Sequence, residues 1–289
     1  MFDLLFAKTF LIVGGMLVIT TFFSRINKAY ETTEEAIINI LGSFVVLFLI
    51  IGFSDFFPYN IILLAVFSGF IGWSIGPTVS ILGRRFKQGQ YFKKRGIKSK
   101  SVITKKTTGW DKVWGAKDEK KTMYYESKNP KELFGINSDK YQSIDKDFES
   151  SYKLKKDSYD QEWQNIVFQA MLGTTIAVLS TAFLVFNSAF NFGILGGYLF
   201  IALIILIVMG FLNALIFKSR FFSLAKSYFG VIIFTGYLLY DFNLLEQRMN
   251  IGDESWSSAV KIAVNLYLDI INLFLDLLVL PFFVGFPQG

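Results

Sequence analysis

The sequence predicts an all-α membrane protein, a bundle of seven transmembrane helices with one polar insert between the third and the fourth. Hydrophobic residues make up 53% of the 289 residues, and the mean hydropathy is +0.44. Only 18% of the residues are charged, whereas about 25% is usual in a soluble domain. The charges collect between positions 84 and 162 and leave long apolar stretches on either side. This distribution is typical of a multi-pass membrane protein.

A segment needs roughly 20 mostly apolar residues to cross a bilayer as a helix. We expect helices rather than a barrel, because no stretch alternates in polarity and a segment in lipid must satisfy its own backbone hydrogen bonds. The segments that qualify are 5–23, 36–53, 60–82, 163–186, 193–217, 225–246 and 259–283. The chain therefore divides into 1–83 with three helices, the insert 84–162, and 163–289 with four helices.

Glycines recur four residues apart in two of these segments, at Gly72 and Gly76 and at Gly193 and Gly197. Small residues at this spacing allow two helices to approach closely in a membrane. We interpret both pairs as packing positions rather than as parts of a binding site.

The insert 84–162 begins with a strongly basic stretch. Residues 84–100 contain eight Lys or Arg and no acid. Such a stretch is most often a solvated juxtamembrane segment, but it could also contact anionic lipid headgroups. We expect no nucleic-acid partner. The rest of the insert could be partly disordered, or it could form a small folded unit around Trp110, Trp114, Tyr124, Tyr125 and Phe134.

The absence of two residue types narrows the possible chemistry. The sequence contains no Cys and no His. It therefore has no disulfide framework, no thiolate nucleophile and no Cys-based metal site. Histidine is the side chain that most often titrates near neutral pH, so a pH response in that range must come from carboxyl groups.

Acidic residues nevertheless lie inside the last two predicted spans. In 259–283, Asn265, Asp269, Asn272 and Asp276 are four, three and four residues apart and so form one stripe along a helix face. Asp241 lies near the end of the preceding span, which a short loop joins to the last one. We expect the two helices to form an antiparallel hairpin in which Asp241 and Asp269 face each other. Intramembrane acids are rare and usually functional.

Two facing carboxyl groups in a medium of low dielectric constant cannot both ionise cheaply, so they are expected to share a proton. Loss of that proton would push the helices apart or recruit a cation. Ca²⁺ suits such a place because it prefers carboxylate, amide and water oxygens. The alternative is that the acids are protonated or solvated and only hold the helices together. For Asp276 the two interpretations are equally balanced.

The last two spans also resemble a known family. The stretches "LLYDFNLL" and "AVNLYLDIINLFLDLL" are similar to the last two helices of the Bax inhibitor-1, or transmembrane Bax inhibitor motif, family. The upstream stretches "GFIGWSIGPTVS", "VFQAMLGTTIAVLSTAF" and "FGILGGYLF" resemble its third, fourth and fifth helices. The resemblance covers all seven spans and leaves out 84–162.

The resemblance implies a bacterial-type member with the last helix at the centre of the bundle and a pH-sensitive Ca²⁺ leak. Carried over, the family's two sensor acids are Asp241 and Asp269.

Three features depart from the family. The turn 54–59 contains no Arg, which removes the partner that bacterial relatives offer to the sensor. Asp276 adds an acid where the family has an uncharged residue. The family also has a cytoplasmic N-terminus, whereas the basic residues near 25–28, 84–87 and 218–220 place it outside by the positive-inside rule.

We therefore expect a pH-sensitive calcium or cation leak in a bacterial-type plasma membrane. Asp241 and Asp269 are expected to form the proton sensor, gate and cation ligands, and Asn265, Asn272 and Asp276 to line the ion route. No permanently bound cofactor is expected, and Ca²⁺ is the expected transported or site-bound ion. One alternative is a non-transporting membrane regulator that binds partners through the basic insert. An intramembrane aspartyl protease is disfavoured because Asp269 lies in "LYLD" without the glycines of such enzymes, and we expect no enzymatic activity.

Overall fold

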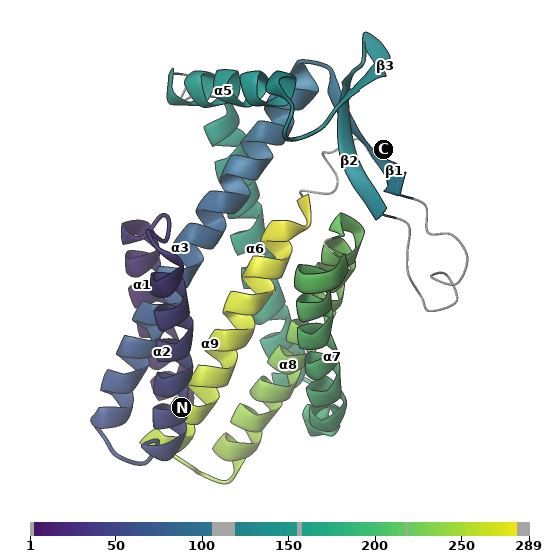
Figure 1. Ribbon diagram of the computed structural model, residues 1–289. Helices are drawn as coiled ribbons and strands as arrows, with labels where there is room; N and C mark the ends of the chain where they lie inside the picture. The colour runs from purple at the N-terminus through teal and green to yellow at the C-terminus, as the bar shows by residue number, and fades with distance from the viewer. Residues whose placement is uncertain (1–2, 106–118, 155–157, 218, 282–289) are drawn as a thin grey trace. The chain divides into compact units, whose positions relative to one another are not determined.

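The computed structural model describes residues 3–105, 119–154, 158–217 and 219–281 (Figure 1). Within this part of the chain, seven helices are long and apolar enough to cross a membrane. Six of them are α1 Leu4–Ile26, α2 Thr33–Gly52, α3 Tyr59–Lys94, α6 Ser158–Phe186, α8 Arg220–Asn250 and α9 Trp256–Val279, and the seventh is the span Phe192–Phe217, which contains α7 Gly196–Leu212. The prediction of an all-α multi-pass membrane protein is confirmed. The end of the last predicted span, 282–283, lies outside the described residues.

Local sequence signals define where several helices begin. Asp3 caps α1 by accepting a hydrogen bond from the backbone N–H of Leu5 at 2.9 Å. Thr32 caps α2 by accepting one from the N–H of Glu35 at 3.1 Å, and the Glu35 carboxylate accepts the N–H of Glu31. These side chains satisfy N–H groups that have no partner within the helix. A short 3₁₀ helix, η1 Phe192–Leu195, leads into α7, and a π-helical turn, η2 Asn213–Phe217, follows it.

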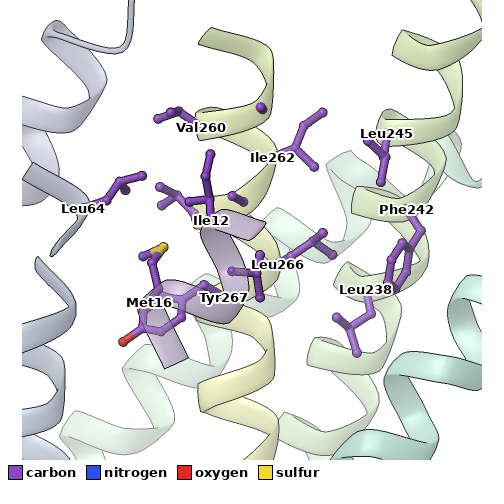
Figure 2. Packing of buried hydrophobic residues seen from close by; sticks show 14 of the residues in the cluster. Ile12, Met16, Leu64, Leu238, Phe242, Leu245, Val260, Ile262, Leu266 and Tyr267 are labelled. Atoms are coloured by element: carbon purple, nitrogen blue, oxygen red, sulfur yellow. The ribbon is translucent and has the colours of Figure 1, made fainter. Parts of the chain in front are cut away.

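The core of the first compact unit, residues 1–82 and 166–281, is built around α9. Half of the most apolar stretch of α9 is buried, a larger share than in any of the other six membrane helices. It packs against α1 and α8. Figure 2 shows Ile12 and Met16 of α1 and Leu238 and Phe242 of α8 with the residues of α9. The central position expected for the last helix is confirmed.

A polar contact near the middle of α9 fixes this helix in the core. The Tyr267 side chain is fully buried, and its hydroxyl lies 2.5 Å from Thr20 Oγ1 of α1. Thr20 Oγ1 in turn lies 3.2 Å from the carbonyl oxygen of Ser68 in α3, to which it can donate. Three helices that are far apart in the sequence therefore meet at one hydrogen-bonded point.

The glycine pairs predicted to be packing positions behave differently from each other. A Cβ on Gly76 would overlap the backbone carbonyl oxygens of Asn27 and Ser24, and a Cβ on Gly72 would overlap that of Thr20. This pair therefore lets α3 approach the backbone of α1, as expected. Around Gly197, by contrast, a Cβ would meet nothing within 4 Å.

The second compact unit contains residues 83–165 and is described by itself. The helix α3 continues past the apolar stretch to Lys94 and is followed by a three-stranded antiparallel sheet. The strands are β1 Ile97–Lys105, β2 Glu119–Glu126 and β3 Asn129–Phe134, and the helix α5, Asp139–Leu154, comes next. Tyr124 packs against the buried core of this unit, which contains Tyr91, Phe92, Ile97, Phe134, Tyr141, Ile144 and Phe148. Trp110 and Trp114, which we also named as possible core residues, lie outside the described part of the chain.

Candidate functional site

The last two membrane helices form a tight antiparallel hairpin, which sets the depth of every side chain between them. Five residues, 251–255, join α8 to α9. Gly252 has φ of 70°, a left-handed conformation that glycine adopts without strain. The Asp253 carboxylate accepts hydrogen bonds from the N–H of Ser255 at 2.9 Å and from the hydroxyl of Ser258 at 2.5 Å. The connection is therefore short and is stabilised by the hydrogen bonds that Asp253 accepts from Ser255 and Ser258.

This hairpin brings Asp241 of α8 and Asp269 of α9 together in the interior. Their exposed fractions are 2% and 6%, and the two carboxyl groups are close enough to interact with each other. A hydrogen bond between two carboxyl groups requires a proton on one of them, because an ionised carboxylate can only accept. A hydrogen bond between Asp241 and Asp269 would therefore join the two helices through a single proton, and this role of the pair stays a prediction.

One further side chain supports the pair, and one oxygen is left without a donor. Asn265 Nδ2, one turn before Asp269, donates to Asp241 Oδ1 at 3.3 Å. Asp269 Oδ2 is buried and has no hydrogen-bond partner among the described residues. Tyr237, one turn before Asp241 in α8, interacts electrostatically with both carboxyl groups. A buried oxygen of this kind is a natural place for a proton, a water molecule or a cation.

The structure divides the predicted polar stripe of α9 into two clusters. Asn265 and Asp269 lie with Asp241, as expected from their spacing. Asp276 lies apart from them, next to a different part of α8. There, Lys226 Nζ is 3.6 Å from Asp276 Oδ1, and the hydroxyl of Ser227 interacts with the carboxylate. Asn272 is half-buried between the two clusters. The roles of these residues in an ion route stay predictions.

Lys226 is a site residue that was not predicted from the sequence, although it lies inside the predicted span 225–246. A lysine in an apolar helix is as unusual as an acid there and should have been paired with one. Its position four residues before Gly230 also places the two on the same helix face. The combination of a base and a glycine on one face was the signal that could have located the partner of Asp276.

The oxygen ligands at the pair suit a passing cation better than a resident one. Ca²⁺ takes six to eight oxygen ligands. The two carboxyl groups and the Asn265 side chain offer at most five oxygens. Within the described residues, no cluster of three or more Asp or Glu side chains is positioned to hold a metal ion. The metal-ligand assignment of Asp241 and Asp269 stays a prediction.

The basic stretch 84–100 is partly neutralised within its own unit. Arg84 Nη2 lies 2.5 Å from Glu149 Oε1, and Arg95 Nη1 lies 3.1 Å from Asp147 Oδ2, both acids belonging to α5. Lys87 is buried. In the described part of the chain, the exposed side chains of this stretch without an ion-pair partner include those of Arg85, Lys93 and Lys98.

Comparison with known proteins places the α8–α9 hairpin in a family. Residues 157–284 match the family model described as inhibitor of apoptosis-promoting Bax1. This region contains α6 to α9 and therefore both acidic clusters. Over these residues, the chain is similar to the Bax inhibitor-1 family. The upstream Bax inhibitor-1 resemblance, in α3, lies outside the matched region and stays a prediction.

Three relatives show how far the likeness extends. Protein LIFEGUARD 4 of Arabidopsis thaliana is 37% identical over 116 residues, which cover 39% of this chain and 45% of the relative. The Golgi anti-apoptotic protein of Vaccinia virus (strain Lister) is 39% identical over 114 residues, covering 39% and 46%. Uncharacterized protein Cj0236c of Campylobacter jejuni is 36% identical over 113 residues, also covering 39% and 46%. The chain thus spans less than half the length of the relatives that it matches. The bacterial relative is compatible with a bacterial-type member of the Bax inhibitor-1 family.

Proposed function

We propose that the protein is a pH-sensitive cation leak, with Ca²⁺ as the principal ion, in a bacterial-type plasma membrane. The observation that carries this proposal is the buried contact between the carboxyl groups of Asp241 and Asp269, which lie on two neighbouring membrane helices. The match of residues 157–284 to the Bax inhibitor-1 family supports a membrane protein of this type.

The direction of the pH effect follows from the shared proton. At low pH one proton joins the two carboxyl groups and holds α8 against α9. As the pH rises and the proton leaves, two like charges face each other where the dielectric constant is low, and their repulsion is strong. The repulsion is relieved when the helices separate or when a cation binds. Flux is therefore expected to rise with pH.

The remaining groups near the hairpin do not compete for this titration. Hydrogen bonds from Ser258 and the Ser255 backbone lower the pKa of Asp253 to about 2, and the hydrogen bond from Ser257 and the charge of Lys261 lower the pKa of Asp55. Both loop carboxylates stay ionised above pH 5, and the chain contains no His. A midpoint between pH 5 and 8 would therefore point to acids of the membrane helices, with Asp241, Asp269 and Asp276 as the buried candidates.

The proposal is tested by Ca²⁺ flux into liposomes that contain the purified protein and an internal dye, with the external pH varied from about 5 to 8. We expect wild-type flux to rise with pH through a midpoint. Asp241→Asn and Asp269→Asn keep a hydrogen-bonding side chain but cannot titrate, so both are expected to abolish the pH dependence. Asp55→Asn, which changes an exposed loop acid, serves as the control and should keep the wild-type profile.

Two results would count against the leak. A titration that survives in both membrane Asn variants would show that the pair is not the sensor. An absence of flux at every pH, with the protein folded, would leave the two carboxyl groups as a structural latch. Under that second result, regulation through the second unit becomes the better interpretation.

A non-transporting membrane regulator is the second candidate function. It is favoured by the folded unit 83–165, which has its own buried core, and one relative is named an anti-apoptotic protein. Arg85, Lys93 and Lys98 are the exposed cations with which this unit would contact anionic headgroups or an acidic partner.

Exchanging these three cations for Ala is expected to lower the amount of anionic lipid that copurifies with the protein, measured by native mass spectrometry. The control is the exchange of Lys128 and Lys131, exposed lysines of the same unit outside 84–100. Equal lipid retention in both variants would remove the basic stretch from the headgroup proposal. Loss of a crosslinked membrane partner with lipid retention intact would favour the regulator.

A further inference from the structure

The Asp276 carboxylate lies in a closely fitted site that α8 provides. Lys226 Nζ is 3.6 Å from Asp276 Oδ1, and the exposed fractions of the two side chains are 34% and 8%. The hydroxyl of Ser227, itself buried, is hydrogen-bonded to the same carboxylate. An ammonium and a hydroxyl from adjacent residues of α8 thus satisfy one buried acid of α9.

A glycine of α8 leaves the space in which this contact forms. A Cβ on Gly230 would overlap the Asp276 carboxyl group itself. The aliphatic part of Lys226 passes next to α7, because a Cβ on Gly210 would lie 3.5 Å from Cε of Lys226, an ordinary contact distance. The Asp276 carboxyl group therefore lies where α8 presents only backbone.

The location of this contact gives it a relation to the carboxyl pair. Asp276 follows Asp269 by seven residues, or two helical turns, which places it on the same face about 10 Å further along α9. Asp269 Oδ2 has no hydrogen-bond partner among the described residues, whereas Asp276 already has a cation beside it. A cation that moves along this face therefore meets two carboxyl sites. The Asp269 site has an oxygen without a hydrogen-bond partner in the described part of the chain, and the Asp276 site already has the ammonium of Lys226 beside it.

We propose that Lys226 is a tethered counter-ion that occupies the Asp276 end of the polar stripe and that a transported cation must displace. This inference rests on the proposed cation leak. Under this proposal, Lys226 determines how readily cations enter or leave at the Asp276 end of the stripe. Asp276 then binds a cation only when the lysine has moved away.

Equilibrium Ca²⁺ binding tests the proposal without any measurement of transport. The full-length protein in detergent is titrated with Ca²⁺, and its thermal unfolding midpoint is recorded. Lys226→Gln vacates the Asp276 carboxylate and is expected to gain a Ca²⁺-dependent rise in the midpoint on the order of a few degrees. The double variant Lys226→Gln/Asp276→Asn should lose this gain. Lys261→Gln is the control, because Lys261 of α9 forms an exposed ion pair in which its Nζ lies 3.7 Å from Oδ1 of Asp55. The unfolding midpoint of this variant should respond to Ca²⁺ as that of the wild type does.

Flux supplies a second test that begins with Asp276→Asn alone. Asp276→Asn leaves the ammonium without its counter-charge beside the route, and is expected to lower Ca²⁺ flux several-fold at high pH. Adding Lys226→Gln to Asp276→Asn removes the unpaired charge and should restore the flux. A purely structural ion pair would not show such a rescue.

Distinct outcomes separate this inference from the proposed function. If the wild type carries no flux but Lys226→Gln gains Ca²⁺ binding that needs Asp276, the leak fails and the counter-ion role stands. If wild-type flux is pH-dependent but Lys226→Gln gains no Ca²⁺ effect, or the gain persists in the double variant, the counter-ion role is overturned. Wild-type flux in Asp276→Asn would overturn it as well.

Discussion

Gly76→Val is expected to prevent α1 and α3 from packing together and to leave little folded protein. A Cβ at this position overlaps the backbone carbonyl oxygens of Asn27 and Ser24. Backbone atoms cannot rotate away as the end of a flexible side chain can, so the whole of α1 would have to shift. Overpacking inside a protein typically costs 1–3 kcal/mol, and we expect a cost of about 3 kcal/mol or more here.

The control for Gly76→Val is the same exchange at Gly14, which lies in α1 on an exposed face. A Cβ on Gly14 meets nothing within 4 Å, so the effect of valine on helix propensity is measured there without a clash. The midpoint of unfolding by denaturant in detergent should drop strongly for Gly76→Val and change little for Gly14→Val. Equal midpoints for the two variants would show that α1 and α3 do not approach as closely as described.

Phe148→Ala is expected to unfold the second unit, residues 83–165, while the membrane helices stay folded. Phe148 is 1% exposed, and the centroid of its ring lies 5.4 Å from the centroid of the Tyr91 ring. Loss of a buried Phe side chain costs about 3–5 kcal/mol. A unit of fewer than 100 residues has little stability to spare, so this loss approaches the whole of its folding free energy.

Limited proteolysis of the full chain reports on this unit directly. Phe148→Ala should be cut within 83–165 much faster than the wild type, while fragments of the apolar helices persist. Ile136→Ala, at a residue of the same unit that is 56% exposed, should be cut at the wild-type rate. Resistance of Phe148→Ala to cleavage would mean that the aromatic cluster does not hold the unit together.

Hydropathy alone predicted the membrane helices because a span in lipid must be long and apolar. It did not predict that α3 continues to Lys94, since a helix that leaves the apolar region becomes polar without breaking. It also did not predict the sheet of the second unit. The ring of Tyr124 meets those of Phe134 and Tyr141, and such contacts between an apolar-poor strand and a later helix leave no local periodicity to recognise.

The candidate site was predictable where it depended on spacing within one helix and on a short loop. Those two features placed Asn265 and Asp269 on one face and brought Asp241 opposite them. The partner of Asp276 depended on which face of α8 turns toward α9, fifty positions away in the sequence. Gly230 decides that face because only a residue without a side chain fits against the carboxylate. This information becomes visible only when both helices are seen together.

The short turn at 251–255 makes the hairpin behave as a lever with a fixed pivot. The hydrogen bonds of Tyr267 tie α9 to α1 and α3, so we expect α8 to be the helix that moves. Asp269 lies about 20 Å and Asp276 about 30 Å along α9 from its start. A rotation about the turn thus separates Lys226 from Asp276 by about 1.5 times the distance by which it separates Asp241 from Asp269. If the carboxyl pair separates as the proposed leak requires, we expect the displacement to be larger at Asp276 than at Asp269.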